Sequence, residues 1–252
     1  MKGLLRKAAR LVFGKILPRV AYPVLKGPLK GAKFILGTHG GAGGGASVYF
    51  NLIEPLQTRA FIRTIKKGDI LFDVGANVGY YTVLGSRLTG NQGKVFSFEP
   101  LVRNISYLYR HVKINKLNNV TIIPSACSNN QSIVTFLENP IASMGRIENS
   151  AINAPGTNAT LVSTVSLDAV AAKLAIQPNV LKIDVEGAEL AVLQGAEKMI
   201  ADFKPIIFLS VHSPKLRTDC LNYLQNFGYT FEALEEDHEN AMEFLCLAKS
   251  RS

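Results

Sequence analysis

Residues 70–79 read Ile-Leu-Phe-Asp-Val-Gly-Ala-Asn-Val-Gly, an apolar run that leads directly into a glycine-containing turn. Four of the first five residues are apolar, which predicts a buried strand over residues 70–74. The apolar spacing that follows predicts a helix over residues 78–88. In open α/β sheets, ligands bind where a strand passes into a helix in this way. The stretch therefore predicts both a strand of an α/β sheet and a binding turn.

The residue types in this turn suit a cofactor. Gly75 lacks a Cβ, so a ligand can approach its backbone, and Gly79 allows the helix to pack closely on the strand. Asn77 stands where nucleotide-binding loops often carry glycine, and asparagine tolerates the left-handed conformation better than most residues. Asp73, at the end of the strand, can accept hydrogen bonds from backbone amides or hold a ligand's ammonium group. We expect these four residues to bind the cofactor.

The rest of the chain continues as alternating strands and helices. Further strands are predicted over residues 94–99, 120–124, 180–185, 205–211, 229–234 and 243–248, and helices over 52–66, 101–116, 188–201 and 215–227. Extra strands are predicted near residues 133–137 and 162–167, inside an otherwise irregular stretch. Alternating elements of this kind indicate a mostly parallel α/β sheet with helices on both faces.

The last two predicted strands are joined too tightly to be parallel. Residues 235–241 leave no room for a crossover helix, so these strands are expected to form an antiparallel hairpin. A parallel sheet that closes with such a hairpin is typical of Rossmann-like methyltransferases. Dinucleotide-binding Rossmann domains usually end differently.

A carboxylate stands at the end of the second predicted strand, in Glu99-Pro100. There it can accept hydrogen bonds from both ribose hydroxyls of a cofactor, an arrangement that NAD-dependent enzymes share. The alternative is a structural acid at the start of the next helix. Ser125 and Ala126 follow the third strand, where we expect contact with an adenine base; an ordinary turn is the alternative.

A second motif, Lys182-Ile-Asp184-Val-Glu186-Gly187, carries three charges in a predicted central strand. Alternation places Lys182, Asp184 and Glu186 on one side of that strand. Charges there are costly unless they are paired or functional. We expect Asp184 and Glu186 to contact substrate or accept a proton, with Lys182 neutralising them. The alternative is a structural Lys–Asp pair with Glu186 at the helix start. His212, after the next strand, is a further candidate base.

The positive charge is confined to one end of the chain. Residues 1–33 contain nine lysines and arginines and no acid, which accounts for the whole net charge of +9. A protein that wraps nucleic acid usually carries its positive charge on the folded domain, so we expect no nucleic-acid partner. The three cysteines, Cys127, Cys220 and Cys246, lack CxxC spacing, which argues against disulfides or a zinc site and fits a reducing compartment.

These patterns divide the chain into a basic N-terminal segment (residues 1–36), a glycine-rich loop (37–50) and a catalytic domain (51–252). Residues 2–17 have the spacing of a basic amphipathic helix, which suits an anionic membrane surface. A helix packed on the domain is the alternative. The glycine-rich loop lacks the ending of a P-loop and is interpreted as a lid or a plain linker. We expect a cytoplasmic protein and hypothesise peripheral membrane contact through residues 1–33.

The two motifs together resemble FkbM-type methyltransferases. The matching stretches are residues 68–82, Phe98-Glu99-Pro100, Ser166-Leu167-Asp168 and residues 181–196. The resemblance implies a class I Rossmann-like fold with a seven-stranded sheet, S-adenosylmethionine as cofactor, and usually O-methylation of a hydroxyl on a sugar, glycan, lipid or secondary metabolite. By position, it implies cofactor binding by Asp73, Gly75, Asn77, Gly79 and Glu99, a reaction site lined by Lys182, Asp184 and Glu186, and closure over the cofactor by Glu54.

Two other functions share part of the pattern. An NAD-dependent oxidoreductase has the glycine turn and the acid but not the closing hairpin. A non-catalytic, membrane-peripheral protein with a degenerate cofactor fold accounts for the basic N-terminus. Some O-methyltransferases clamp the acceptor oxygen with a metal, but beyond Asp184 no set of ligands is apparent, so we expect no required metal. The acceptor is expected to be a small molecule or glycan, in a pocket built from residues 37–50 and 138–160.

Overall fold

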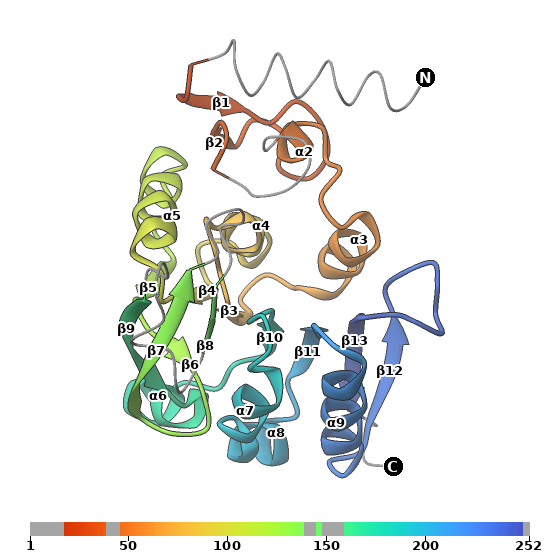
Figure 1. The fold of residues 1–252 in the computed structure, drawn as a ribbon. Helices are drawn as coiled ribbons and strands as arrows, with labels where there is room; N and C mark the ends of the chain where they lie inside the picture. The colour runs from red at the N-terminus through yellow and green to blue at the C-terminus, as the bar shows by residue number, and fades with distance from the viewer. Residues whose placement is uncertain (1–17, 39–45, 139–144, 148–158, 249–252) are drawn as a thin grey trace.

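The computed structural model describes residues 18–38, 46–138, 145–147 and 159–248 (Figure 1). Its centre is a seven-stranded sheet in the order β12-β13-β11-β10-β3-β4-β5. The strands are β3 (Ile70–Val74), β4 (Lys94–Phe98), β5 (Val120–Ile123), β10 (Val180–Ile183), β11 (Ile206–Ser210), β12 (Tyr229–Ala233) and β13 (Glu243–Ala248). The predicted α/β class and seven-stranded sheet are confirmed.

Strand directions in this sheet follow the sequence-based expectation. β10 pairs in parallel with both β3 and β11, and β4 pairs in parallel with β3 and β5. β13 alone runs antiparallel, between β11 and β12, so the predicted closing hairpin is confirmed. The carboxyl ends of β3, β4, β10 and β11 therefore meet at one edge of the sheet, where open α/β sheets bind ligands.

Helices cover both faces of the sheet. α3 (Pro55–Thr64), α4 (Tyr80–Thr89) and α5 (Val102–Ile114) lie on one side, and α6 (Leu167–Leu174), α7 (Glu189–Gln194), α8 (Glu197–Phe203) and α9 (Pro214–Gln225) on the other (Figure 1). Because side chains alternate along a strand, Leu71 is buried in the core that also contains Phe61 of α3 and Leu84 of α4, while Phe72 is buried in the core that contains Leu193 of α7. Each fully buried side chain of this size contributes about 1.5–3 kcal/mol.

A second, smaller sheet lies beside the β5 end of the main one (Figure 1). It has the order β6-β9-β7-β8, from β6 (Ala126–Cys127), β7 (Ser132–Glu138), β8 (Gly145–Ile147) and β9 (Ala159–Val165). The extra strands predicted in this region are confirmed, with one correction. Residues 166 and 167 do not extend β9, because the Ser166 hydroxyl accepts a hydrogen bond from the Ala169 N–H and so caps α6.

Most predicted boundaries differ by one to three residues, and two differences need a structural explanation. β10 ends at Ile183, two residues early, which matters for the site described below. The single helix predicted over residues 188–201 is two helices, α7 and α8. Asp168 causes the break, since its carboxylate accepts hydrogen bonds at 2.9 Å from the N–H groups of Lys198 and Met199 and caps α8.

The described part of the N-terminal segment packs on this domain. β1 (Ala21–Pro23) and β2 (Lys33–Ile35) form an antiparallel hairpin. His111 of α5 links it to the first binding turn: the Ile35 N–H donates to His111 Nε2 at 2.9 Å, and His111 Nδ1 lies 2.6 Å from the Val78 carbonyl oxygen. Phe34 is fully buried in the same core as α4. Residues 18–36 thus share a core with the catalytic domain.

Several expectations concern residues without a described placement. The amphipathic helix predicted over residues 2–17, and residues 39–45 of the glycine-rich loop, lie outside the described residues. The end of that loop is not irregular, because Ala46–Tyr49 form the short helix α2. Within the described ranges, no helix combines the length and hydrophobicity needed to cross a membrane.

Candidate active site

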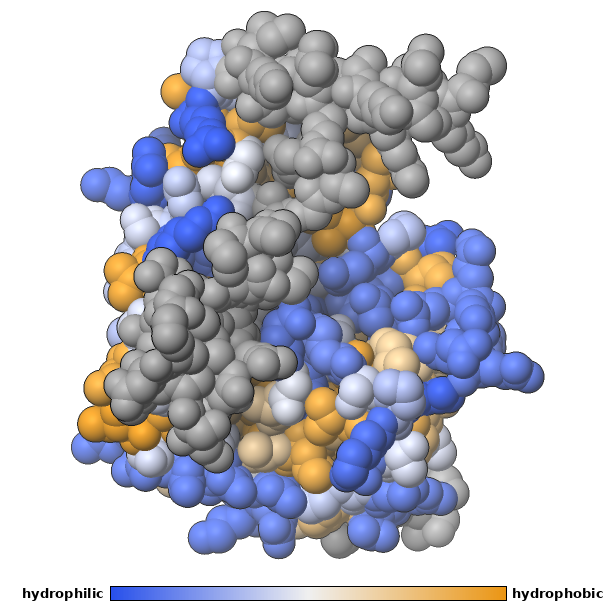
Figure 2. Space-filling model, viewed as in Figure 1, coloured by the Kyte–Doolittle hydropathy of each residue, from blue (hydrophilic) through white to orange (hydrophobic). Residues whose placement is uncertain are grey.

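A cavity of about 490 Å³ opens at the edge where β3, β4, β10 and β11 end. Small-molecule sites typically enclose about 300–1,000 Å³. Nine of the twelve residues predicted for the site line this cavity: Glu54, Gly75, Asn77, Glu99, Ser125, Ala126, Asp184, Glu186 and His212. The other three, Asp73, Gly79 and Lys182, are not among the residues that line it. Figure 2 shows mostly hydrophilic residues on the side of the molecule that carries β12 and the loop after it.

Gly75, in the turn between β3 and α4, is needed for close packing inside the protein as well as for the expected approach of a ligand. Gly75 has a φ of +80°, and the N–H groups of Gly75 and Ala76 donate to the Phe98 carbonyl oxygen at 3.0 and 2.9 Å. A Cβ on Gly75 would lie 1.8 Å from the carbonyl oxygen of Asp184. The glycine is therefore required because two site turns touch here, in addition to any approach by a ligand.

Asn77 and Glu99 form the next contact along the cavity. Asn77 is left-handed, with a φ of +51°, as its side chain allows. Its N–H donates to Glu99 Oε2 at 2.8 Å, and the Leu101 N–H donates to Glu99 Oε1 at 2.9 Å. Glu99 thus does bind the backbone at the start of α5, which was the structural alternative. Each carboxylate oxygen can accept more than one hydrogen bond, so this contact is compatible with a ligand.

The environment of Glu99 shifts its titration. Only 4% of the residue is exposed. Burial raises the pKa of Glu99 to about 7, although the N–H groups of Leu101 and Asn77 lower it. A buried carboxylate that faces a cavity and titrates near neutrality is suited to gain hydrogen bonds from a ligand.

Asp73 does not occupy the place expected for it. The residue is 1% exposed, and its Oδ2 accepts a hydrogen bond from the Thr82 hydroxyl at 2.6 Å. Burial raises its pKa to about 6, while the Thr82 hydrogen bond and the charge of Lys182 lower it. Asp73 therefore stabilises the turn between β3 and α4 through its hydrogen bond with Thr82 of α4.

Gly79 and the segment after β5 also have roles that differ in detail from the prediction. A Cβ on Gly79 would lie 2.5 Å from Leu108 Cδ1, so the glycine makes room for α5 and not only for the strand. Ser125 and Ala126 both line the cavity, and Ser125 Oγ lies 3.0 Å from Ser163 Oγ. Ala126 belongs to β6 of the smaller sheet, so that sheet forms one wall of the cavity.

Lys182 is the buried partner of Asp184. Its Nζ lies 3.0 Å from Asp184 Oδ2 and 4.8 Å from the centre of the Tyr81 ring. Burial lowers the pKa of Lys182, but Asp184, Glu54 and Asp73 together raise it above its usual value. The Tyr81 hydroxyl in turn donates to Glu54 Oε2 at 2.7 Å. The pair agrees both with the expected neutralisation of Asp184 and with the structural alternative of a Lys–Asp pair. Glu54 joins the site through Tyr81.

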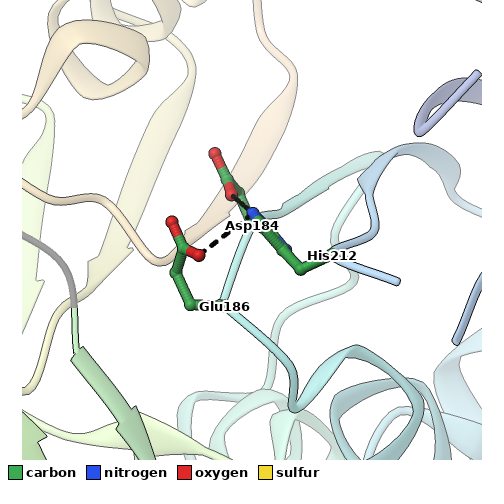
Figure 3. Close-up of side chains that lie close together, drawn as sticks. All are labelled: Asp184, Glu186 and His212. Carbon is green, nitrogen blue, oxygen red and sulfur yellow. Dashed lines mark ion pairs between the residues drawn. The ribbon is translucent and has the colours of Figure 1, made fainter. Parts of the chain in front are cut away.

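Glu186 and His212 meet Asp184 at the mouth of β10 and β11 (Figure 3). His212 Nε2 lies 3.5 Å from Asp184 Oδ1 and 3.4 Å from Glu186 Oε2. β10 has already ended at Ile183, so strand alternation does not aim Glu186; a turn with a φ of +53° at Glu186 does. Burial raises the pKa of Glu186, and His212 lowers it. These three residues form what we call the carboxylate–histidine cluster.

The second nitrogen of His212 is held by a residue that the sequence did not single out. His212 Nδ1 lies 2.6 Å from Oε1 of Glu189, which is fully buried at the start of α7. The same oxygen accepts the Gly187 N–H at 2.9 Å. The hydrogen bond to Glu189 raises the pKa of His212. The acid three residues after Glu186 was the only sequence signal for this contact.

Two more carboxylates line the cavity without having been predicted. Glu235 follows β12 and Glu243 begins β13. Burial and the charge of Glu54 raise the pKa of Glu243 to about 8. Both residues lie at the ends of the antiparallel hairpin and not at the carboxyl ends of the parallel strands. The rule that ligands bind at those carboxyl ends therefore does not predict them.

The structure groups Asp184 with two possible companion ligands that were not apparent as a set in the sequence, while the need for a metal stays untested. One ligand atom each from Asp184, Glu186 and His212 lies within 4.8 Å of the others. His212 had been considered only as a base. The parallel pairing of β10 with β11 brings it beside the second motif.

Comparison with known proteins assigns this fold. The family model of the methyltransferase FkbM domain matches residues 73–248 of this chain. The hexuronic acid methyltransferase AglP of Haloferax volcanii is 28% identical over 158 residues, which cover 62% of this chain and 61% of that protein. A probable cobalt-precorrin-6B C(15)-methyltransferase of Saccharolobus solfataricus is 38% identical over 60 residues, 23% of this chain and 30% of that protein.

Solved structures agree at the level of fold. The methyltransferase FkbM from Methylobacillus flagellatus has a TM-score of 0.51 and 17% identity, over 82% of this chain and 54% of that chain. A ribosomal protein L11 methylase from Lactobacillus delbrueckii has a TM-score of 0.50 and 8% identity, over 78% of each chain. The chain thus spans about three fifths of the curated relative from Haloferax and about half of the FkbM structure.

The sheet order and the domain match place the chain among the Rossmann-like methyltransferases, a class whose cofactor is S-adenosylmethionine. The chain belongs to the FkbM methyltransferase family. This assignment replaces the alternative of an NAD-dependent oxidoreductase. The cavity fits the cofactor, because the buried Glu99 carboxylate faces it as an acceptor for ribose hydroxyls.

Proposed function

We propose that this methyltransferase methylates a hydroxyl oxygen on a sugar unit. The observation that carries the proposal is the carboxylate–histidine cluster, which lines the same cavity as Glu99. The Haloferax volcanii relative supports a sugar acceptor, since its name describes a hexuronic acid methyltransferase.

Each end of the cavity binds a different reactant. Gly75, Asn77 and Glu99 form the end that suits the cofactor, and Asp184, Glu186 and His212 form the end that suits the acceptor. The contact between Gly75 and the Asp184 backbone fixes the two ends relative to each other. Holding both reactants in line is the main contribution that a methyltransferase makes to the rate.

S-adenosylmethionine supplies a methyl group on a positively charged sulfur, which is a good leaving group. The acceptor oxygen forms a bond to the methyl carbon as the carbon–sulfur bond breaks, and S-adenosylhomocysteine leaves. The hydroxyl proton passes to a carboxylate oxygen of Glu186. Glu186 is the stronger candidate base, because Lys182 already holds one oxygen of Asp184.

The remaining lining residues favour an acceptor rich in hydroxyl groups. Glu54, Glu235 and Glu243 all face the cavity, and carboxylates accept hydrogen bonds from hydroxyls. The carboxylates of Glu54 and Glu235 repel an anionic group. We therefore expect a neutral sugar to be preferred over a free hexuronic acid.

The test uses the full chain with donor carrying a labelled methyl group and matched pairs of neutral hexosides and hexuronic acids. We expect label in the neutral sugar as a methyl ether, which survives mild alkaline treatment. Label that alkali releases would mean methylation of a carboxyl group. That result, or no label in any of the sugars, would contradict the proposal.

Membrane contact through the basic residues 1–33 stays a separate proposal. Leu29 and Ala32 are buried in the core, so a truncation that spares the fold removes only residues 1–17. We expect the full chain to co-sediment with anionic vesicles and the truncated chain to do so less. Equal sedimentation of both would refute a role for this segment.

A further inference from the structure

The spacing within the carboxylate–histidine cluster is unusual for direct hydrogen bonds. His212 Nε2 lies 3.5 and 3.4 Å from the oxygens of Asp184 and Glu186. Charge-assisted N–H···O bonds are about 2.7–2.9 Å long. Ligand atoms held about 2.1 Å from a tetrahedrally coordinated cation are about 3.4 Å apart. The separations from the imidazole nitrogen therefore match ligands around an ion better than an imidazolium bound to two carboxylates.

Glu189 prepares His212 for such a role. The buried Glu189 carboxylate favours a proton on Nδ1, so in the neutral ring Nε2 is the nitrogen that can bind a metal. The oxygens of Asp184 and Glu186 face Nε2 and need a positive charge between them, and the 3.5 and 3.4 Å separations favour a metal ion over a proton on Nε2. Metal-binding histidines usually donate their other N–H to a carboxylate, as here. Oε1 of Glu189 also accepts the Gly187 N–H, while its buried Oε2 has no hydrogen-bond partner in the described part of the chain.

The charge around the cluster is not balanced by the protein. Lys182 lies 3.0 Å from Oδ2 of Asp184 and leaves Oδ1 facing His212. Glu54 and Glu235 line the same cavity, and its lining in the described residues contains no lysine or arginine. A bound cation would offset this excess of carboxylates.

We propose that Asp184, Glu186 and His212 bind a divalent first-row transition metal, for which Mn²⁺ serves as the spectroscopic probe, with Glu189 as the positioning residue for His212. Carboxylates suit Mn²⁺, and imidazole suits the later metals of this row, so a mixed set is consistent with either. Asp184 contributes Oδ1, Glu186 contributes Oε2 and His212 contributes Nε2.

The use of this metal, though not its binding, rests on the proposed function. All three ligands line the cavity, so the remaining coordination positions face the acceptor. An open position is what a metal needs to hold a hydroxyl oxygen and favour loss of its proton. The second carboxylate oxygen of Glu186 remains to accept that proton.

The test is a titration of the chelator-treated full chain with Mn²⁺ alone, followed by electron paramagnetic resonance. We expect one equivalent to bind, with spin-echo modulation from one directly coordinated imidazole nitrogen. His212→Gln should abolish this modulation, and Glu186→Gln should weaken binding at least tenfold. Glu189→Gln should weaken binding about 10- to 100-fold, as changes to residues that orient metal ligands do.

Glu235→Gln is the matched control, because it removes a carboxylate from the same cavity but outside the cluster. We expect its Mn²⁺ affinity to stay within about twofold of wild type. Saturable binding that lacks the nitrogen modulation in the wild type would overturn the proposal, and so would no saturable binding. Equal losses in Glu235→Gln and Glu186→Gln would indicate a general charge effect and would overturn it as well.

The wild-type spectrum needs no variant, so a misfolded variant does not leave the proposal open. Methyl transfer measured with and without chelator separates the two proposals. Label transfer to a hydroxyl that persists with chelator would remove the catalytic use of the metal and keep the proposed function. Confirmed Mn²⁺ binding without transfer to any hydroxyl acceptor would contradict the proposed function instead.

Discussion

The protonation state of Glu99 should set the affinity for S-adenosylhomocysteine. Burial raises its pKa to about 7 in the free protein. Hydroxyl donors favour the ionised carboxylate, so a bound ribose should lower this pKa and release a proton. Affinity should therefore fall as the pH drops through 7. If the protonated form binds negligibly, the dissociation constant at pH 6 is about tenfold that at pH 8.

Isothermal titration calorimetry at pH 6, 7 and 8, in buffers of different ionisation enthalpy, measures both quantities. At pH 7 about half a proton should leave per molecule bound. Glu99→Gln cannot titrate, and its amide would face the N–H groups of Asn77 or Leu101. This variant should bind about tenfold or more weakly at pH 8 and show no change with pH.

Glu243→Gln is the control, because Glu243 is a second cavity carboxyl whose pKa is raised, to about 8. It should keep the tenfold pH effect on S-adenosylhomocysteine affinity. Asp73, near Glu99 and with a pKa of about 6, also titrates in this range. An unchanged pH effect in Glu99→Gln would refute the reasoning and assign the effect to another group.

Three further predictions concern the free energy of unfolding, measured by urea denaturation. Gly75→Ala should cost about 3 kcal/mol or more, because its Cβ would lie 1.8 Å from the Asp184 carbonyl oxygen. Gly228 has the same φ of +80° but open space around it, so Gly228→Ala should cost only about 1–2 kcal/mol. Equal costs would show that the close contact is absent. Lys182→Met should cost about 2–3 kcal/mol by leaving Asp184 unpaired; a stabilised variant would contradict that pairing. Ser166→Ala should cost about 1 kcal/mol through loss of the α6 cap, and no loss would contradict the cap.

Local patterns were sufficient for the framework of the fold. Hydrophobic runs and helical spacing gave β3, α4 and most other elements to within a few residues, because these periodicities are properties of neighbouring positions. The short link between β12 and β13 was sufficient to predict their antiparallel pairing. Where a distant residue intervened, the prediction failed: Asp168 caps α8 from another part of the chain and divides the predicted helix.

The site shows the same division. The sequence by itself determined which residues stand at the carboxyl ends of the strands, and hence that Glu99, Asp184 and His212 share one edge of the sheet. Only the tertiary structure decided which atoms meet there. Glu189 reaches His212 across 23 positions of sequence, and Tyr81 reaches Glu54 across 27. Such contacts depend on strand order, register and the turn at Glu186, and no periodicity in the chain encodes them.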